Sequence, residues 1–343
     1  MQKDREPALP NLHERNPLLP PRLKRLFLLL VPPIVVEAMR YLRRGVRRIP
    51  KKLSSPQPAS EPAMQETIVP IASAFEQVEP LEWEMVPDSD SVWSDSSGWA
   101  HHSIVEAQQK KWPNFVADVE SVSPLGRSHE APPNAAPDVS THNTVMTFAY
   151  ILGRMAAGRK TLSVLDWGGG LGQYFVYARN LYPEFTFDYV IKELPEACEI
   201  GSTLVPEATF LADEKAALSR QYDLVWASGA VHYTRDCYGL LDRFCASAIS
   251  SIMITRLPVL EQHDDFLVVQ RPHRYGYMTE YPGWFMNKER LASFMSARGF
   301  KLVREFLVAE QYIVPNAPET ARCIGLLFQR STSLDRGAHE FAE

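Results

Sequence analysis

The clearest chemical signal in this sequence is one carboxylate followed by alternating glycines. Asp166 ends a short apolar run, and three glycines follow it at alternate positions, Gly168, Gly170 and Gly172. Residues 171–181 then show a helical pattern, so a strand leads through a glycine turn into a helix. This order opens a nucleotide-binding βα unit, because glycines let the backbone pass close to a ligand. A dinucleotide fingerprint would need a third glycine at position 173, where the chain has Gln173.

Acidic and polar residues end the next predicted strands. Glu193 follows the strand at 186–191, where a carboxylate can accept hydrogen bonds from ribose hydroxyls; a solvated turn acid is the alternative. Asp213 follows the strand at 208–211 and is expected either to meet an adenine amino group or to cap a helix. Ser228 ends the fourth predicted strand. These positions predict a cofactor site along one edge of a parallel sheet.

The acid-x-Gly-x-Gly-x-Gly spacing resembles motif I of class I methyltransferases, which use S-adenosyl-L-methionine. The resemblance implies that Asp166 helps to hold the amino-acid part of this cofactor. It also implies an α/β fold with a Rossmann-like seven-stranded sheet, helices on both faces and a final antiparallel hairpin. The strands are predicted at 162–166, 186–191, 208–211, 222–228, 251–255, 300–308 and 324–329.

Catalytic and acceptor-binding residues are expected after the strand ends, because loops there hold ligands in such sheets. His232 and Tyr233 are expected to face the transferred methyl group. Histidine titrates near neutral pH, so His232 is the first candidate for a general base and His142 the second; a structural histidine is the alternative at both positions. Arginine grips carboxylate or phosphate, and tryptophan stacks on sugars. The predicted acceptor pocket contains Tyr233, Arg256, Arg271, Tyr281 and Trp284.

The sequence predicts no metal site. His263, Asp264 and Asp265 are adjacent, a spacing that does not let them converge on one ion, and the four cysteines lack metal-ligand spacing. Scattered cysteines in apolar patterns fit a reducing, cytoplasmic compartment.

The chain divides by composition into five parts. Residues 1–52 are basic and apolar, and the apolar run at 26–36 is too short to span a bilayer. A short apolar wedge among basic residues is typical of a segment on an anionic membrane surface, here residues 22–52; a solvated arm or a packed helix is the alternative. The net charge of -5 argues against a nucleic-acid partner. The remaining parts are a flexible linker at 53–80, a Trp-rich prefix or lid at 81–137, the methyltransferase domain at 138–331 and a C-terminal tail at 332–343.

The prefix is predicted as a helical or irregular extension with a helix at 97–111. Its tryptophans are expected to dock it onto the main domain, or to cover a cofactor or stack on sugar rings. They are Trp83, Trp93, Trp99 and Trp112.

A group of sequence blocks points to a narrower resemblance. The blocks are His142–Thr144, Leu165–Gly172, Asp188–Pro195, Thr255–Pro258, Val269–Pro272 and Gly276–Tyr281 with Trp284. Together they resemble a family of uncharacterised methyltransferases encoded mainly among bacterial surface-polysaccharide genes. The expected function is O-methylation of a glycan, a sugar-phosphate acceptor or a lipid-linked glycan, in the cytoplasm or on the inner face of the cell membrane. Two alternatives stay open: a non-catalytic S-adenosyl-L-methionine-binding scaffold or regulator of a polysaccharide assembly complex, and an NAD-dependent oxidoreductase.

Overall fold

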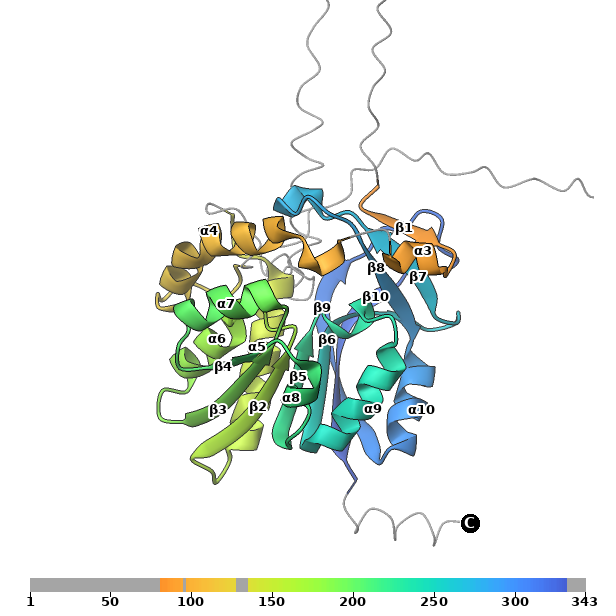
Figure 1. Cartoon of the computed structure of the whole chain (residues 1–343). Helices are drawn as coiled ribbons and strands as arrows, with labels where there is room; N and C mark the ends of the chain where they lie inside the picture. The colour runs from red at the N-terminus through yellow and green to blue at the C-terminus, as the bar shows by residue number, and fades with distance from the viewer. Residues whose placement is uncertain (1–80, 95–96, 128–134, 332–343) are drawn as a thin grey trace, which may run out of the picture. The chain divides into compact units, whose positions relative to one another are not determined.

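The computed structural model describes residues 81–94, 97–127 and 135–331 (Figure 1). The predicted membrane-associating arm, the linker and the C-terminal tail lie outside the described residues. Within the described ranges, no helix combines the length and apolar character needed to cross a membrane.

Parallel strands form the centre of the sheet, and the inner ones are largely apolar runs buried between helices. In spatial order they are β4 (Thr209–Leu211), β3 (Thr186–Lys192), β2 (Thr161–Trp167), β5 (Tyr222–Ser228) and β6 (Ala248–Leu260). Two antiparallel strands continue the sheet, with β10 (Arg322–Arg330) between β6 and β9 (Phe300–Gln311). All seven predicted strands are therefore present, and the final hairpin is antiparallel.

The predicted count of seven strands is too low, because the described residues alone form a sheet of ten. The additional strands are β1 (Trp83–Val86), β7 (Phe266–Gln270) and β8 (Tyr281–Asn287). β6 is 13 residues long; its first part pairs with β5, and its last two residues pair with β8. β7 then pairs antiparallel with both β8 and β1. β6 therefore belongs to the parallel core and also joins it to the added strands β8, β7 and β1.

Helices cover both faces of the sheet (Figure 1). One apolar cluster packs α9 (Cys237–Ser247) and α10 (Lys288–Ala297) against the strands. The cluster on the opposite face is formed with α4 (His102–Val119), α5 (Val139–Ala156), α6 (Gln173–Leu181) and α7 (Pro195–Leu204). Short segments complete the fold: α3 (Asp90–Ser94), α8 (Glu214–Ala217), η1 (Gly98–Ala100), η2 (Val231–Tyr233) and η3 (His273–Tyr275).

Side-chain caps fix where several helices begin. Asp236 and Asn287 cap α9 and α10. The cap of α5 is Asp138, whose carboxylate accepts a hydrogen bond from the Thr141 amide at 2.8 Å.

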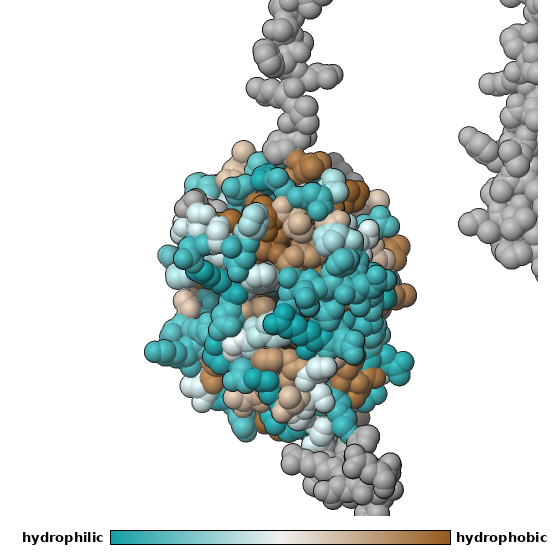
Figure 2. All heavy atoms as spheres, turned by 90° about the vertical axis from the view of Figure 1, so that its right-hand side faces the viewer, coloured by the Kyte–Doolittle hydropathy of each residue, from teal (hydrophilic) through white to brown (hydrophobic). Residues whose placement is uncertain are grey.

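The Trp-rich prefix packs on the sheet and its helices. Trp83 and Trp112 are buried, and the Trp83 ring lies 5.7 Å from that of Phe285 in β8. Figure 2 shows the side of the molecule that carries β1 and α3, where hydrophilic residues predominate and apolar residues appear in patches. The prefix is thus part of the folded layer that surrounds the site described next.

Candidate functional site

A cavity of about 490 Å³ opens at the carboxyl ends of the parallel strands. This is where open α/β sheets bind ligands, and the volume suits a small molecule. Its walls come from four segments: the glycine loop (Gly168–Gly170) with Gln173 and Tyr174, the end of β3 and start of α7 (192–197), the loop after β5 (228–230, 233, 234), and η1 with α4 (Trp99, Ala100, Ile104, Val105, Gln108). Trp167 and Arg256 complete the lining.

The glycine loop has room for hydrogen atoms only. Gly168 has a φ of 69°, and a Cβ there would lie 2.6 Å from the Cβ of Ala230. Gly170 has a φ of 57°, and its Cβ would lie 2.7 Å from Oε1 of Gln173. Both conformations favour glycine, and both positions line the cavity. Gly172, the third predicted glycine, precedes α6 and does not line the cavity.

Asp166 lies beneath the loop and not on the cavity wall, which corrects the expectation that it contacts a ligand directly. A Cβ at Gly169 would lie 2.7 Å from the Asp166 carboxyl carbon. The Tyr189 hydroxyl donates to Oδ2 at 3.1 Å, while Oδ1 has no hydrogen-bond partner among the described residues. Burial raises the Asp166 pKa to about 8; the Tyr189 bond lowers it and the charge of Glu193 raises it further. Asp166 therefore supports the loop from below.

Glu193 and Ser228 line the cavity as predicted. Burial raises the pKa of Glu193, against hydrogen bonds from the Leu194 and Gly170 backbone and the positive charge of Lys192. The Ser228 hydroxyl is 2.7 Å from the Tyr174 hydroxyl. Glu193 thus presents a carboxyl group one strand away from the glycine loop, where it can accept hydrogen bonds from ligand hydroxyls.

His232 is buried behind the cavity, so the expectation that it faces a ligand is wrong. The side chain is 1% exposed, and neither ring nitrogen has a hydrogen-bond partner among the described residues. Burial, aided by the positive charge of Arg256, lowers the His232 pKa to about 3. Its ring lies 3.9 Å from that of Tyr233, which does line the cavity. His142 also lies outside the lining.

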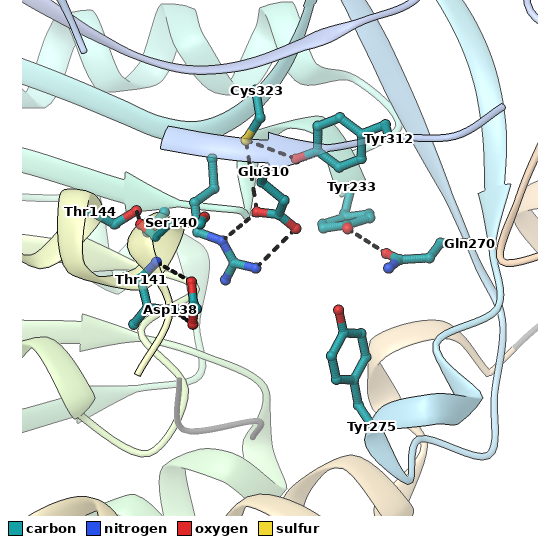
Figure 3. Close-up of polar contacts among 12 residues, drawn as sticks. Asp138, Ser140, Thr141, Thr144, Tyr233, Gln270, Tyr275, Glu310, Tyr312 and Cys323 are labelled. Atoms are coloured by element: carbon teal, nitrogen blue, oxygen red, sulfur yellow. Dashed lines mark hydrogen bonds and ion pairs between the residues drawn. The ribbon is translucent and has the colours of Figure 1, made fainter. Parts of the chain in front are cut away.

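Two predicted acceptor residues do reach the cavity, and each has a polar partner. The Tyr233 hydroxyl donates to Gln270 at 2.6 Å (Figure 3). Arg256 donates two hydrogen bonds to Glu310, at 3.2 Å and 3.4 Å. Figure 3 shows these two contacts, with Glu310 and Gln270 lying behind the residues that line the cavity. Tyr233 and Arg256 thus form a polar part of the cavity wall that other side chains hold in place.

The other predicted acceptor residues lie outside the cavity lining. Tyr281 is buried and stacks on Trp99, with ring centroids 4.4 Å apart. Trp284 donates to the Arg235 carbonyl at 3.1 Å. Arg271 is engaged by two carboxylates, of Glu84 at 2.9 Å and Glu280 at 3.0 Å.

Asp213 also lies outside the lining. Its carboxylate accepts hydrogen bonds from the amides of Lys215 and Ala216, which makes it the N-cap of α8. Of the two expectations for this residue, the structure shows the capping role.

The prefix and α6 contribute wall residues that were not among the predicted site residues. Trp99 lines the cavity, and its indole nitrogen is buried without a hydrogen-bond partner among the described residues. Gln108 of α4 and Gln173 of α6 line it as well. Only Trp99 had a signal in the sequence, namely the alternative expectation that a prefix tryptophan covers a cofactor.

The chain was compared with known proteins. No family model matches it, and no curated protein matches it. Among solved structures, an S-adenosylmethionine-dependent methyltransferase from Clostridium acetobutylicum is 11% identical, with 55% of this chain and 92% of that chain covered and a TM-score of 0.38. The magnesium protoporphyrin IX methyltransferase of Synechocystis is 12% identical, with coverages of 66% and 98% and a TM-score of 0.39. The CcbJ methyltransferase of Streptomyces caelestis is 12% identical, with coverages of 59% and 94% and a TM-score of 0.40. At these TM-scores the similarities carry neither a family assignment nor an activity.

Proposed function

We propose that this protein is an S-adenosyl-L-methionine-dependent methyltransferase. The observation that carries the proposal is that Glu193 and the glycine loop Gly168–Gly170 wall one cavity at the carboxyl ends of adjacent parallel strands. A carboxyl group can accept hydrogen bonds from ribose hydroxyls, and the loop lets a nucleoside approach the backbone.

The cavity fits this cofactor chemically. Its lining includes two unpartnered buried donors, the Trp99 indole N–H and the Gln173 amide, which a polar ligand would satisfy. Glycine at positions 168 and 170 lets the loop pass close to Ala230 and Gln173 while its backbone still lines the cavity. Gln173 replaces the third glycine of a dinucleotide fingerprint, which disfavours an NAD-dependent oxidoreductase.

The chemistry supplied by the bound cofactor is a methyl group activated by a sulfonium, whose C–S bond breaks as the acceptor's new bond to carbon forms. The protein has to align the acceptor and exclude water. Tyr233 and Arg256 line the cavity and can position the acceptor. His232 is buried and does not line the cavity, so it is not placed to take the acceptor proton.

A glycan or sugar-phosphate acceptor is the finer part of the proposal. Trp99 and Tyr233 offer aromatic surfaces to a sugar ring, and Arg256 offers a cation to a phosphate or carboxylate. We place the reaction in cell-surface polysaccharide biosynthesis, in the cytoplasm or at the inner membrane face.

Cofactor binding is tested by calorimetry with S-adenosylhomocysteine. Glu193→Ala should weaken binding by about tenfold or more, since a hydrogen bond to a charged group contributes about 1.5–3 kcal/mol. Glu199→Ala, on the exposed side of α7, is the matched control and should bind as the parent protein does. Equal affinity of Glu193→Ala and the parent, or preference for NADH in a competition, would overturn the cofactor assignment.

One observation favours a second candidate, a non-catalytic cofactor-binding scaffold or regulator. No histidine is among the described residues that line the cavity. Transfer of labelled methyl groups from S-adenosyl-L-methionine to a glycan extract of a strain lacking the gene would exclude this candidate. Cofactor binding without transfer would support it.

Membrane attachment through residues 22–52 is a separate part of the proposal, and it rests on their basic and apolar composition. A variant lacking residues 1–52 should no longer sediment with anionic liposomes but should still bind S-adenosylhomocysteine. Unchanged sedimentation would contradict the attachment.

A further inference from the structure

A second cavity, of about 30 Å³, adjoins the first at the N-terminal end of α5. Thr141 and Thr144 line it from α5, and Gln173 and Arg256 line both cavities. This volume is close to that of one water molecule, so it holds a group of very few atoms. The two cavities therefore share part of their walls, and the small one is lined mainly by residues with polar groups.

Gln173 lines both cavities, and the nitrogen of its side-chain amide is unpaired among the described residues. The side chain is 3% exposed, and its Nε2 has no hydrogen-bond partner among the described residues. Its Oε1 lies 2.7 Å from the position a Cβ would take on Gly170. A buried amide without partners is costly unless a ligand satisfies it.

Gln108 presents a second carbonyl oxygen at the same place. Its Nε2 donates to the Tyr277 hydroxyl at 3.2 Å, which turns Oε1 the other way. That oxygen lies 3.4 Å from the Cβ position of Gly170. Two side-chain acceptors from different helices thus converge above one glycine of the cavity wall.

Hydrogen-bond donors line the small cavity. They are Nε2 of Gln173, which lies 3.4 Å from the same Cβ position of Gly170, the Arg256 guanidinium and the positive end of the α5 helix dipole. Two carboxylates are nearby, but Glu310 is paired with Arg256 and Asp138 with the Thr141 amide and hydroxyl (Figure 3). Two amide oxygens, with an amide N–H and a guanidinium nearby, match an ammonium next to a carboxylate.

We propose that Gln108 and Gln173 form a subsite for a zwitterionic α-amino acid group. The two Oε1 atoms accept hydrogen bonds from the ammonium, and Nε2 of Gln173 donates to the carboxylate at the mouth of the small cavity. This inference rests on the proposed function, because the ligand is the amino-acid part of the cofactor. With this subsite, helix α4 of the prefix contributes to ligand selectivity as well as to packing.

The test compares three ligands by calorimetry on the full chain. S-adenosylhomocysteine carries both groups, its decarboxylated analogue keeps the amine alone, and 5′-methylthioadenosine lacks the amino acid. Gln108→Ala should weaken binding of S-adenosylhomocysteine and of its decarboxylated analogue by about tenfold, because one hydrogen bond to a charged group is lost. Binding of 5′-methylthioadenosine should be unchanged. Gln109→Ala, the exposed neighbour on α4, is the matched control and should change none. Gln108→Glu keeps the shape and adds a negative charge, so it should bind the amine-bearing ligands at least as tightly as the parent.

The outcomes separate the two levels of inference. Selective loss of the amine-bearing ligands supports the subsite. An equal loss for all three ligands in a folded Gln108→Ala variant, or weaker amine binding by Gln108→Glu, would overturn it and leave Gln108 as a packing residue. If the parent binds none of the three, the proposed function itself fails.

Discussion

Gly168→Ala should lower the stability of the folded protein for two reasons, and each has a known magnitude. The new Cβ meets two penalties: a φ of 69°, which costs an L-residue about 1–2 kcal/mol, and a contact of 2.6 Å with the Cβ of Ala230, comparable to overpacking at about 1–3 kcal/mol. Gly158→Ala is the matched control. It has a φ of 76° and no atom within 4 Å of its Cβ, so it meets the first penalty alone. The difference between the two variants isolates the contact at the cavity wall.

Denaturant unfolding should therefore show Gly158→Ala losing about 1–2 kcal/mol and Gly168→Ala about 2–5 kcal/mol. Calorimetry with S-adenosylhomocysteine should show weaker binding by about tenfold or more for Gly168→Ala only, because one misplaced wall costs at least about 1.4 kcal/mol of binding. Adding Ala230→Gly should restore part of both losses. If Gly168→Ala were as stable as Gly158→Ala and bound the ligand normally, the close approach of the two loops would be refuted.

Three further predictions follow from separate features. Burial raises the pKa of Asp166 from 3.8 to about 8 in the folded protein, so the folded state binds more protons between these pH values and its stability should fall as pH rises from about 4 to about 8. Asp166→Asn should reduce this dependence of the unfolding free energy on pH, and an unchanged dependence would contradict the raised pKa. Trp99 lines the cavity, so S-adenosylhomocysteine should change the tryptophan fluorescence of the parent but much less that of Trp99→Phe, and equal changes would place the ligand elsewhere. Ala309 has a φ of 66°, so Ala309→Gly should raise stability by about 0.5–1 kcal/mol in urea unfolding, whereas destabilisation would show that the strand tolerates this backbone without strain.

The strands of the parallel core were predictable because strands buried on both faces form continuous apolar runs. The added strands β1, β7 and β8 were not predictable in this way. Tyr281–Asn287 contains Pro282 and Gly283, both of which argue against a strand. β1 has only four residues and pairs with a strand far along the chain, so no local pattern reveals it.

Site residues were predictable where the position of the backbone alone determines whether a residue lines the cavity. Gly168 and Glu193 follow directly from the rule that strand ends hold ligands. The direction of a side chain is set by the local turn instead: His232 and Tyr233 are adjacent in η2, yet only Tyr233 reaches the cavity. Wall residues from α4 depend on how the prefix packs, which no short stretch of sequence encodes.

The pairing of β1 with β7 also has a consequence for the order of folding. Glu82 and Gln270 are hydrogen-bonded although 188 residues separate them in the chain. As the ribosome releases the protein from its N-terminus, Trp83 emerges long before the strand it lies against exists. Closure of so long a loop is expected to be a late and slow event, because contacts between distant residues lower folding rates. Until then the partly made chain exposes an indole that the finished protein buries, and a chaperone could bind it during synthesis.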